Sequence, residues 1–370
     1  MNRTMKLVDH GQAVWLDFIR RDILVNGELE RLIAEDGVSG VTSNPAIFQQ
    51  AIGDSAQYDG DLQVLQSEAS DSSAMELYEA IAIADIRMAA DQLAATYRQT
   101  EGRDGFVSLE VSPHLARDTA ATAEEARRLW QHVDRPNLMI KIPATPEGLP
   151  AVEQVLSEGI NVNITLMFSL DHYEAVAQAY LAALAKCPRP QSLASVASFF
   201  VSRVDTKTDG LLEEIGSEEA LSLRGKIAIA NSKMAYQRFR ELFHGEVFAD
   251  WRRQGVGVQR VLWASTSTKN PSYRDVFYVE ELVGPETVNT VPPSTLEAFR
   301  DHGEVRNSLT DGLDQAKEDL QRLAALGIDL GAVTEELQRE GIDKFAQPFD
   351  RLLETLEQKG SSLETAESAG

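Results

Sequence analysis

The stretch NLMIKIPAT, residues 137–145, places one lysine, Lys141, inside an apolar run of strand length. Strands of parallel sheets read as near-continuous apolar runs because helices cover both of their faces. Burying an ammonium group there costs free energy unless the group is paired or loses its proton. Taken alone, the strand leaves two interpretations open. Lys141 is either paired with a carboxylate or reaching solvent from the strand end, or it is kept partly neutral to attack a carbonyl.

Outward from this stretch, short apolar runs alternate with longer amphipathic segments over most of the chain. This alternation predicts repeated strand–helix units and disfavours a sandwich of two sheets. Eight strands, each followed by a helix, indicate an α/β fold of the (β/α)8 TIM barrel type ahead of an open, doubly wound sheet. The expected strands cover residues 13–19, 40–44, 106–112, 138–143, 160–168, 193–201, 258–264 and 287–291.

Helical spacing of apolar residues fills the intervals between these strands. Thr122-Ala-Glu-Glu125 matches a capping box, and Gly37, Gly159 and Gly284 are expected just past helix ends. The expected helices cover residues 72–100, 122–132, 149–157, 171–186, 225–243 and 273–282.

The expected domain organisation is a single barrel domain over residues 1–358. The strand pattern stops after Pro292-Pro293, and residues 294–358 are rich in Glu, Gln, Arg and Leu. We therefore expect a helical C-terminal extension over 294–358 that packs on the barrel. Residues 359–370 are small, polar and acidic, which predicts a disordered tail.

The 370-residue chain carries a formal charge of −23. This charge argues against nucleic acid and anionic membranes as partners, so a small anionic substrate would need a local basic pocket. Cys187 is the only cysteine in the sequence, which excludes an intramolecular disulfide and a thiolate zinc cage. The sequence shows no signal-peptide core, no long apolar segment and no metal-binding motif, so we expect a soluble, cytoplasmic protein without a metal.

Polar residues near strand ends are candidates for chemistry, because barrels of this kind build their sites there. Asp17 is flanked by a leucine and a phenylalanine, Asn44 precedes a proline, and Glu110 lies between two aliphatic residues. Each has an ordinary alternative. Asp17 and Asn44 could cap a strand or helix end, and a buried Glu110 could simply be paired.

The fifth expected strand alternates polar and apolar residues, which places Asn161, Asn163 and Thr165 on one face. A polar face on a buried strand needs hydrogen-bonding partners, and a ligand or a water molecule can be one of them. Ser198 in the sixth strand adds a hydroxyl to the same set.

Two cations, Arg203 and Lys269, follow the sixth and seventh strands. Either could bind a phosphate or pair with a surface carboxylate, the commoner outcome in an acidic chain. Together, the strand ends supply an amine, carboxylates that can move protons, amide and hydroxyl donors, and cations. Cleavage of a carbon–carbon bond through an imine requires this set, so it favours a nucleophilic Lys141 over a merely paired one.

Five segments resemble the transaldolases, and in particular their longer bacterial members. They are GVTSNPAIF, FVSLEVSP, NLMIKIPATPEG, GINVNITLMFS and SVASFFVSRVD, and the resemblance extends over roughly residues 10–350. It implies a (β/α)8 barrel that transfers a dihydroxyacetone unit between ketose and aldose phosphates, such as sedoheptulose 7-phosphate and glyceraldehyde 3-phosphate. It also implies a Schiff base, a place in the non-oxidative pentose phosphate pathway, sugar phosphates as partners and no cofactor.

By this resemblance, Lys141 forms the imine, and Asp17 is the general acid/base that takes the proton from the C4 hydroxyl. Glu110 and Thr165 correspond to the pair that positions and activates the water of imine formation and hydrolysis. The implied contacts to the substrate hydroxyls and the phosphate are Asn44, Asn163, Ser198 and Arg203.

Two features separate this chain from other members of the superfamily. The shorter transaldolases carry an arginine just after the serine that matches Ser265, and Lys269 is the cation expected to replace it here. In the fructose 6-phosphate aldolases, the resemblance implies glutamine in place of Glu110 and tyrosine in place of Phe200. The pair found here therefore favours a transaldolase and makes Phe200 a substrate-site candidate.

Three alternatives stay open at this point. The nearest is a fructose 6-phosphate aldolase, and the second is a barrel that binds sugar phosphates without turnover, with Lys141 paired to Glu110. Use of pyridoxal phosphate is the third, because that cofactor also forms a lysine imine. The sequence predicts no oligomeric state, since an apolar helix face that docks the extension looks like one that docks another subunit.

Overall fold

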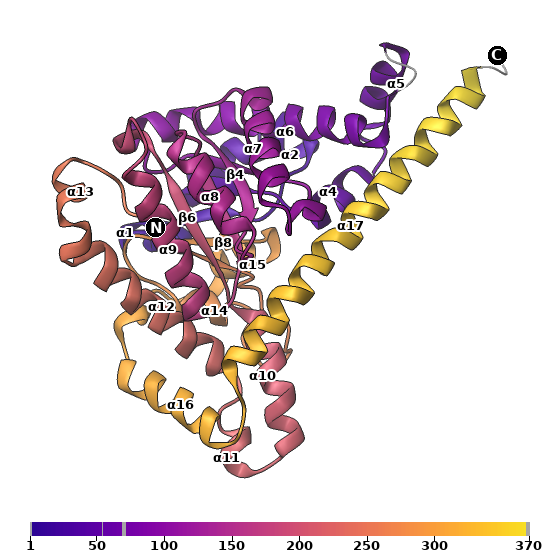
Figure 1. Ribbon diagram of the computed structural model, residues 1–370. Helices are drawn as coiled ribbons and strands as arrows, with labels where there is room; N and C mark the ends of the chain where they lie inside the picture. Colours follow the sequence, from indigo (N-terminus) through magenta and orange to yellow (C-terminus); the bar gives the residue numbers. More distant parts are fainter. Residues whose placement is uncertain (1, 54, 69–71, 368–370) are drawn as a thin grey trace.

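The computed structural model describes the chain over residues 2–53, 55–68 and 72–367. Eight parallel strands close into a barrel in sequence order, which confirms the expected fold (Figure 1). Each strand of the barrel is almost completely buried, because helices cover its outer face. The strands are β1 (Gln12–Leu16), β2 (Val38–Thr42), β3 (Phe106–Glu110), β4 (Leu138–Pro143), β5 (Val162–Met167), β6 (Ser195–Phe200), β7 (Arg260–Ala264) and β8 (Thr287–Val291).

The longer helices surround this barrel and follow the expected segments (Figure 1). They are α6 (Ala74–Gln99), α7 (Thr119–Val133), α8 (Gly148–Ser157), α9 (Leu170–Leu184), α10 (Ser202–Ile215), α12 (Ile227–His244), α15 (Pro293–His302), α16 (Leu313–Ala325) and α17 (Leu330–Glu367). Shorter helices are α1 (Arg3–Asp9), α2 (Arg21–Val25), α3 (Glu28–Asp36), α4 (Pro45–Phe48), α5 (Asp59–Glu68), α11 (Glu218–Leu221), α13 (Ala249–Arg253) and α14 (Phe277–Glu281). Single turns are the π-helix η1 (Gln49–Gly53) and the 3-10 helices η2 (Pro113–Leu115), η3 (Pro190–Ser192), η4 (Glu246–Phe248) and η5 (Ser308–Thr310).

Two local expectations were wrong. Helix α7 begins before the expected capping box: Asp118 accepts a hydrogen bond from the backbone N–H of Ala121 at 3.0 Å, and Thr122 lies inside the helix. Gly37 and Gly159 have the positive φ of residues that end helices, but Gly284 does not. At Gly284 the absence of a side chain serves packing, because a Cβ atom would lie 2.7 Å from Leu309 Cδ1.

Helix α17 is the longest element of the C-terminal extension. It contacts α4, α6, α10, η1 and β5, and its last turns project beyond the body of the molecule (Figure 1). The sequence predicts a disordered tail from residue 359, but the helix continues to Glu367. Lys359 explains part of the difference, because its Nζ pairs with Asp59 at 2.8 Å. Residues 368–370 of the expected tail lie outside the described residues.

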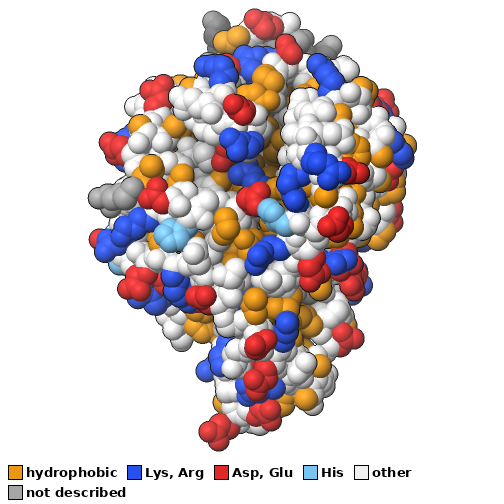
Figure 2. All heavy atoms as spheres, turned by 90° about the vertical axis from the view of Figure 1, so that its left-hand side faces the viewer, with side chains coloured by type: hydrophobic (Ala, Val, Ile, Leu, Met, Phe, Trp, Pro, Cys, Tyr) orange, Lys and Arg blue, Asp and Glu red, His pale blue; other side chains and the backbone are white. Residues whose placement is uncertain are grey.

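The outer surface mixes charges of both signs. On the face seen in Figure 2, acidic and basic side chains lie interspersed among polar and apolar ones. Within the described residues, no helix combines the length and the apolar character that crossing a membrane requires.

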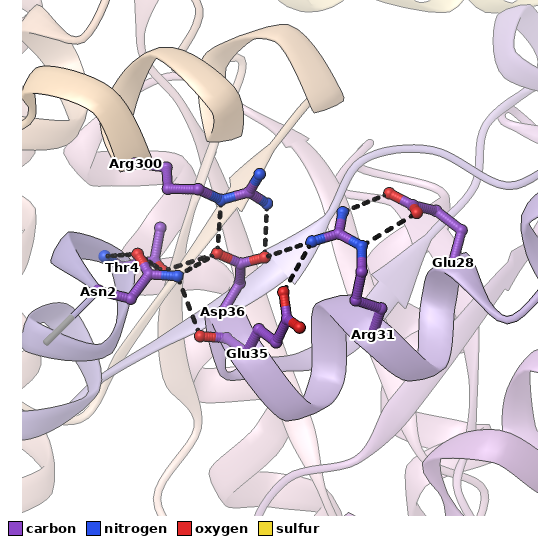
Figure 3. Close-up of polar contacts among 7 residues, drawn as sticks. All are labelled: Asn2, Thr4, Glu28, Arg31, Glu35, Asp36 and Arg300. Carbon is purple, nitrogen blue, oxygen red and sulfur yellow. Dashed lines mark hydrogen bonds and ion pairs between the residues drawn. The ribbon is translucent and has the colours of Figure 1, made fainter.

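A polar cluster ties the N-terminal helix to the barrel (Figure 3). Asp36, at the end of α3, is fully buried and accepts hydrogen bonds from Arg300 Nε at 2.8 Å and from Asn2 Nδ2. Thr4 Oγ1 donates to the same carboxylate at 3.3 Å. Burial by itself raises the pKa of Asp36, but the hydrogen bonds from Arg300 and Asn2 outweigh it and hold the pKa below its usual value. The cluster therefore joins α1, α3 and α15 through one buried charge.

Replacing Arg300 by methionine should destabilise the fold by about 3 kcal/mol at neutral pH, because it removes the closest cation from the buried Asp36 carboxylate and leaves Arg31, at 3.9 Å, as the remaining one. The pair's contribution is present above the pKa of an unfolded aspartate and is lost as the pH falls through the lower pKa of folded Asp36. Chemical denaturation at pH 7 and pH 3 measures both effects. Arg127→Met is the matched control: Arg127 and its partner Glu158 are both partly exposed and lie outside the cluster, so it should cost less than about 1 kcal/mol. Equal losses in the two variants would contradict this account.

Candidate active site

A cavity of about 780 Å³ opens at the C-terminal ends of the strands. Its lining residues come from seven of the eight strands or from the loops that follow them. A barrel of this type carries its chemistry at this end. All of the site residues expected from the sequence line the cavity except Glu110, which contacts Lys141 instead. Those lining residues are Asp17, Asn44, Lys141, Asn163, Thr165, Ser198, Phe200, Arg203, Ser265 and Lys269.

Lys141 projects from β4 with only 6% of its surface exposed. Its Nζ donates a hydrogen bond to the Ser43 carbonyl at 3.0 Å and lies 3.6 Å from Glu110 Oε2. The strand register explains the second contact, because Glu110 of β3 pairs directly with Lys141 of β4. Both sequence interpretations thus describe part of the geometry: the lysine has a carboxylate neighbour, and its amine faces a large cavity.

Glu110 is a buried carboxyl group with a raised pKa. Burial raises the pKa of Glu110 to about 7; nearby Lys141 lowers it, and the charge of Asp17 raises it further. Among the described residues, none donates a hydrogen bond to its two carboxylate oxygens. The group can therefore take up or release a proton at neutral pH beside the Lys141 amine.

Asp17 lies directly after β1 and is held from two sides. Thr42 Oγ1 donates a hydrogen bond to Asp17 Oδ1 at 2.8 Å, and the Asp17 backbone N–H donates to the Val291 carbonyl at 2.9 Å. The carboxylate thus lines the cavity in a fixed position. Thr42 belongs to the quoted GVTSNPAIF segment, yet no pattern in the sequence assigns it this role.

Asn44 both caps a helix and lines the cavity. Its Oδ1 atom caps helix α4 by accepting the Ile47 N–H at 3.0 Å, and its side chain also lines the cavity. Because the oxygen is used by the cap, the side-chain NH₂ group is the part that can donate to a substrate hydroxyl.

Strand β5 supplies a connected polar row. Ser198 donates to Asn163 Oδ1 at 2.6 Å, and Asn163 Nδ2 donates to Ser108 Oγ at 3.0 Å. No described residue is hydrogen-bonded to the Thr165 hydroxyl, although it is buried. Asn161 precedes the strand and donates instead to backbone carbonyls, so it does not belong to the row. A buried hydroxyl without a protein partner is suited to bind a water molecule or a substrate oxygen.

Arg203 is the principal cation of the cavity. Its guanidinium group lies 5.2 Å from the centre of the Phe200 ring, and no described residue accepts a hydrogen bond from its Nη1 atom. Burial lowers the pKa of Arg203, while the charges of Asp17 and Glu340 raise it. A partly buried guanidinium with an unused donor matches the requirements of a phosphate or carboxylate ligand.

The second expected cation is placed differently. Lys269 lies at the rim of the cavity, where its Nζ donates to Ser267 Oγ at 2.9 Å. Ser265 shares a hydrogen bond of 2.9 Å with Ser202 and has the left-handed φ of 58°. Both reach the cavity, but Lys269 is exposed, whereas Arg203 is half-buried.

Phe345, from the distant helix α17, also lines the cavity, and no pattern in the sequence indicates this position. Its position in an amphipathic helix predicts a buried face but not the partner of that face. Taken together, the cavity holds an enclosed amine, the Asp17 carboxyl group, amide and hydroxyl groups and two cations, and the Glu110 carboxyl group lies beside the amine. Such a site can form and hydrolyse an imine with a phosphorylated carbonyl compound.

Comparison with known proteins agrees with this chemistry. The family described as Transaldolase/Fructose-6-phosphate aldolase matches residues 14–356. A protein of Thiobacillus denitrificans named Transaldolase is 49% identical over 359 residues, which covers 95% of this chain and 99% of the relative. Another with that name, from Thermobifida fusca, is 48% identical over 96% of this chain and 97% of its own. A third, from Trichodesmium erythraeum, is 44% identical over 98% of each chain.

Proposed function

The chain belongs to the transaldolase/fructose-6-phosphate aldolase family, and from that premise we propose that it is a transaldolase that works through a Schiff base on Lys141. It transfers a dihydroxyacetone unit from a ketose phosphate, such as sedoheptulose 7-phosphate, to an aldose phosphate, such as glyceraldehyde 3-phosphate. This reaction belongs to the non-oxidative pentose phosphate pathway, and from that role we infer that the enzyme is cytoplasmic. One observation carries the proposal: the enclosed Lys141 amine faces the cavity with Glu110 only 3.6 Å away.

The first half of the reaction forms the imine. The neutral Lys141 amine attacks C2 of the ketose, and the resulting carbinolamine loses its oxygen as water when the C–N double bond forms. Glu110, whose pKa of about 7 lets it carry a proton in either direction, accepts a proton from the attacking nitrogen and supplies it to the leaving oxygen. The unpartnered Thr165 hydroxyl holds that water molecule.

The second half cleaves and remakes a carbon–carbon bond. Asp17 takes the proton of the C4 hydroxyl, the C3–C4 bond breaks, and the aldose phosphate leaves while the electron pair stays on the three-carbon unit as an enamine. C3 of that enamine then attacks the carbonyl carbon of the incoming aldose, and Asp17 returns the proton to the new C4 hydroxyl. Asn44 Nδ2 and the second N–H of Asn163 Nδ2 donate to hydroxyls of the unit, and Ser198 Oγ, whose own proton goes to Asn163, accepts from one.

The matched family includes fructose 6-phosphate aldolases, so release of free dihydroxyacetone is the second candidate function. Glu110 and Phe200 favour transfer, because the resemblance implies glutamine and tyrosine at these two positions in the aldolases.

The deciding experiment combines trapping with product analysis. Borohydride reduction in the presence of fructose 6-phosphate should add the mass of the reduced three-carbon unit to the peptide that contains Lys141, and a protein that gains no mass there has no imine mechanism. Fructose 6-phosphate should be consumed quickly only when erythrose 4-phosphate is present. Equally fast release of dihydroxyacetone without an acceptor would identify an aldolase.

Arg203→Met should raise KM for fructose 6-phosphate by about 10- to 100-fold, the effect of losing one hydrogen bond to a charged group. Lys269→Met should raise it by less than about 5-fold, because an exposed cation contributes little. Steady-state kinetics with fructose 6-phosphate and with unphosphorylated fructose separate phosphate binding from other effects. An Arg203→Met variant that weakens both sugars equally would contradict a phosphate contact.

A further inference from the structure

Helix α17 is fastened across the ends of the strands that carry the imine chemistry. Gln338 is buried, and its Nε2 atom donates to the carbonyls of Ala144 and Leu166, each at 3.0 Å. Ala144 follows β4, which carries Lys141, and Leu166 belongs to β5. The side chain thus satisfies two backbone acceptors where the strands end, which fixes this turn of α17 over the site.

The backbone beneath this contact is irregular. Leu166 has a φ of 59°, and the pairing of β5 with β6 shifts between Ile164 and Met167. Gly341, one turn after Gln338, permits the close approach, because a Cβ atom there would lie 2.9 Å from Leu166 Cδ2. The helix and the strand end therefore fit each other closely.

Contacts on both sides hold the same helix in place. Toward its start, Lys207 of α10 pairs with Glu336 at 2.6 Å and with Glu340 at 2.7 Å. Further along, the Phe349 ring meets Tyr78 of α6 edge to face, with 5.3 Å between ring centres. The segment between these anchors cannot leave the strand ends without breaking buried contacts.

Phe345 lies between the anchors, on the same face of α17 as Gln338 and Gly341. Its ring is 5% exposed, lines the cavity, and lies with its centre 5.7 Å from Lys141 Nζ. A phenyl ring offers no hydrogen-bond donor or acceptor of the kind that holds a water molecule. It therefore covers the α17 side of the amine with a surface that excludes water.

We propose that Phe345 is a specificity-determining residue, which keeps water and protons away from the enamine on Lys141 and so favours transfer over release of dihydroxyacetone. This inference rests on the proposed Schiff-base function. Release requires a proton to add to C3 of the enamine, water to add to C2 of the resulting imine, and the C–N bond to break. Dihydroxyacetone then leaves, and the amine of Lys141 is restored. Each of these steps needs a proton source or a water molecule beside the three-carbon unit, which the ring excludes from its side.

The test measures how the bound three-carbon unit partitions. Wild type, Phe345→Leu and Phe345→Ala are incubated with fructose 6-phosphate and erythrose 4-phosphate, and free dihydroxyacetone is compared with sedoheptulose 7-phosphate formed. We expect the ratio of release to transfer to rise by about tenfold in Phe345→Ala and by less in Phe345→Leu, which keeps an apolar cover. Phe239→Leu is the matched control, since this residue is buried in α12 and belongs neither to the anchors of α17 nor to the described lining of the cavity. Its ratio should equal that of wild type.

Borohydride trapping in every variant separates the outcomes. A Phe345→Ala protein that traps the three-carbon unit but keeps the wild-type ratio overturns this inference and leaves the proposed function intact. A wild-type protein that traps nothing overturns the proposed function itself. If Phe345→Ala does not fold, Phe345→Leu decides alone: a ratio above that of Phe239→Leu supports the inference, and an equal ratio overturns it.

Discussion

Replacing Lys141 by methionine is expected to lower kcat/KM for transfer by at least about 10⁴-fold, since removal of a covalent nucleophile leaves only binding and proton transfer. Methionine fills a similar volume but offers no amine. The borohydride adduct should disappear, while equilibrium binding of fructose 6-phosphate should remain measurable, because Arg203 and Asn163 are unchanged. Stopped assays with high enzyme concentration and mass spectrometry measure these quantities.

Lys141→Arg is the informative control for that experiment. Arginine keeps a positive charge beside Glu110 but is not a nucleophile at neutral pH. If the lysine served only to pair with Glu110 across the 3.6 Å contact, the arginine variant would keep most of its activity. Such a result would restore the interpretation of a barrel that needs only a paired cation.

The barrel could be predicted from the sequence because each strand is covered on both faces. Strands β4 and β8 have the expected bounds, since clear changes in composition flank both. The first two were expected to extend through Asp17 and into Asn44, but both residues lie beyond their strands. Local sequence cannot distinguish a polar residue at a strand end from one just past it, because both follow an apolar run.

A site residue could be predicted from the sequence where it is polar and lies near the end of a strand. Strand-end position places Lys141, Asn163 and Ser198 at one cavity whichever helices surround it. Phe345 could not be predicted in this way. Its contact with Lys141 joins residues far apart in the chain and depends on Gln338 and Gly341, which fit α17 to an irregular strand end.

The net charge of the whole chain does not describe the charge inside the cavity. The chain carries a net charge of −23, and most described arginines near the surface lie beside carboxylates, as Arg300 does. Arg203 forms no ion pair with any described residue and keeps an unused donor in the cavity. An acidic protein can therefore bind an anionic substrate, because one enclosed guanidinium group outweighs the distant, screened surface charge.

Replacing Glu110 by glutamine should slow transfer by about 10²- to 10⁴-fold, the usual contribution of a general acid/base. The pH dependence should change as well. Because the pKa of Glu110 is about 7, wild-type kcat/KM should fall as the pH drops through 7, where the carboxylate that accepts the amine proton becomes protonated. Glutamine cannot ionise, so this limb should be absent from the variant. Kinetics between pH 5.5 and 8.5 measure it, within about 1.5 units of that pKa.

Two comparisons assign the effect to the water step. Glu280→Gln is the matched control, because Glu280 is likewise buried but pairs with Arg274 away from the cavity and from Glu110, so it should leave the profile unchanged. Thr165→Val removes the hydroxyl that we expect to hold the same water molecule, so its effect should not add to that of Glu110→Gln in the double variant. Fully additive losses would mean that the two side chains act in separate steps. A limb near pH 7 that persists in Glu110→Gln would assign that ionisation to a different group, and with it the role of proton carrier beside Lys141.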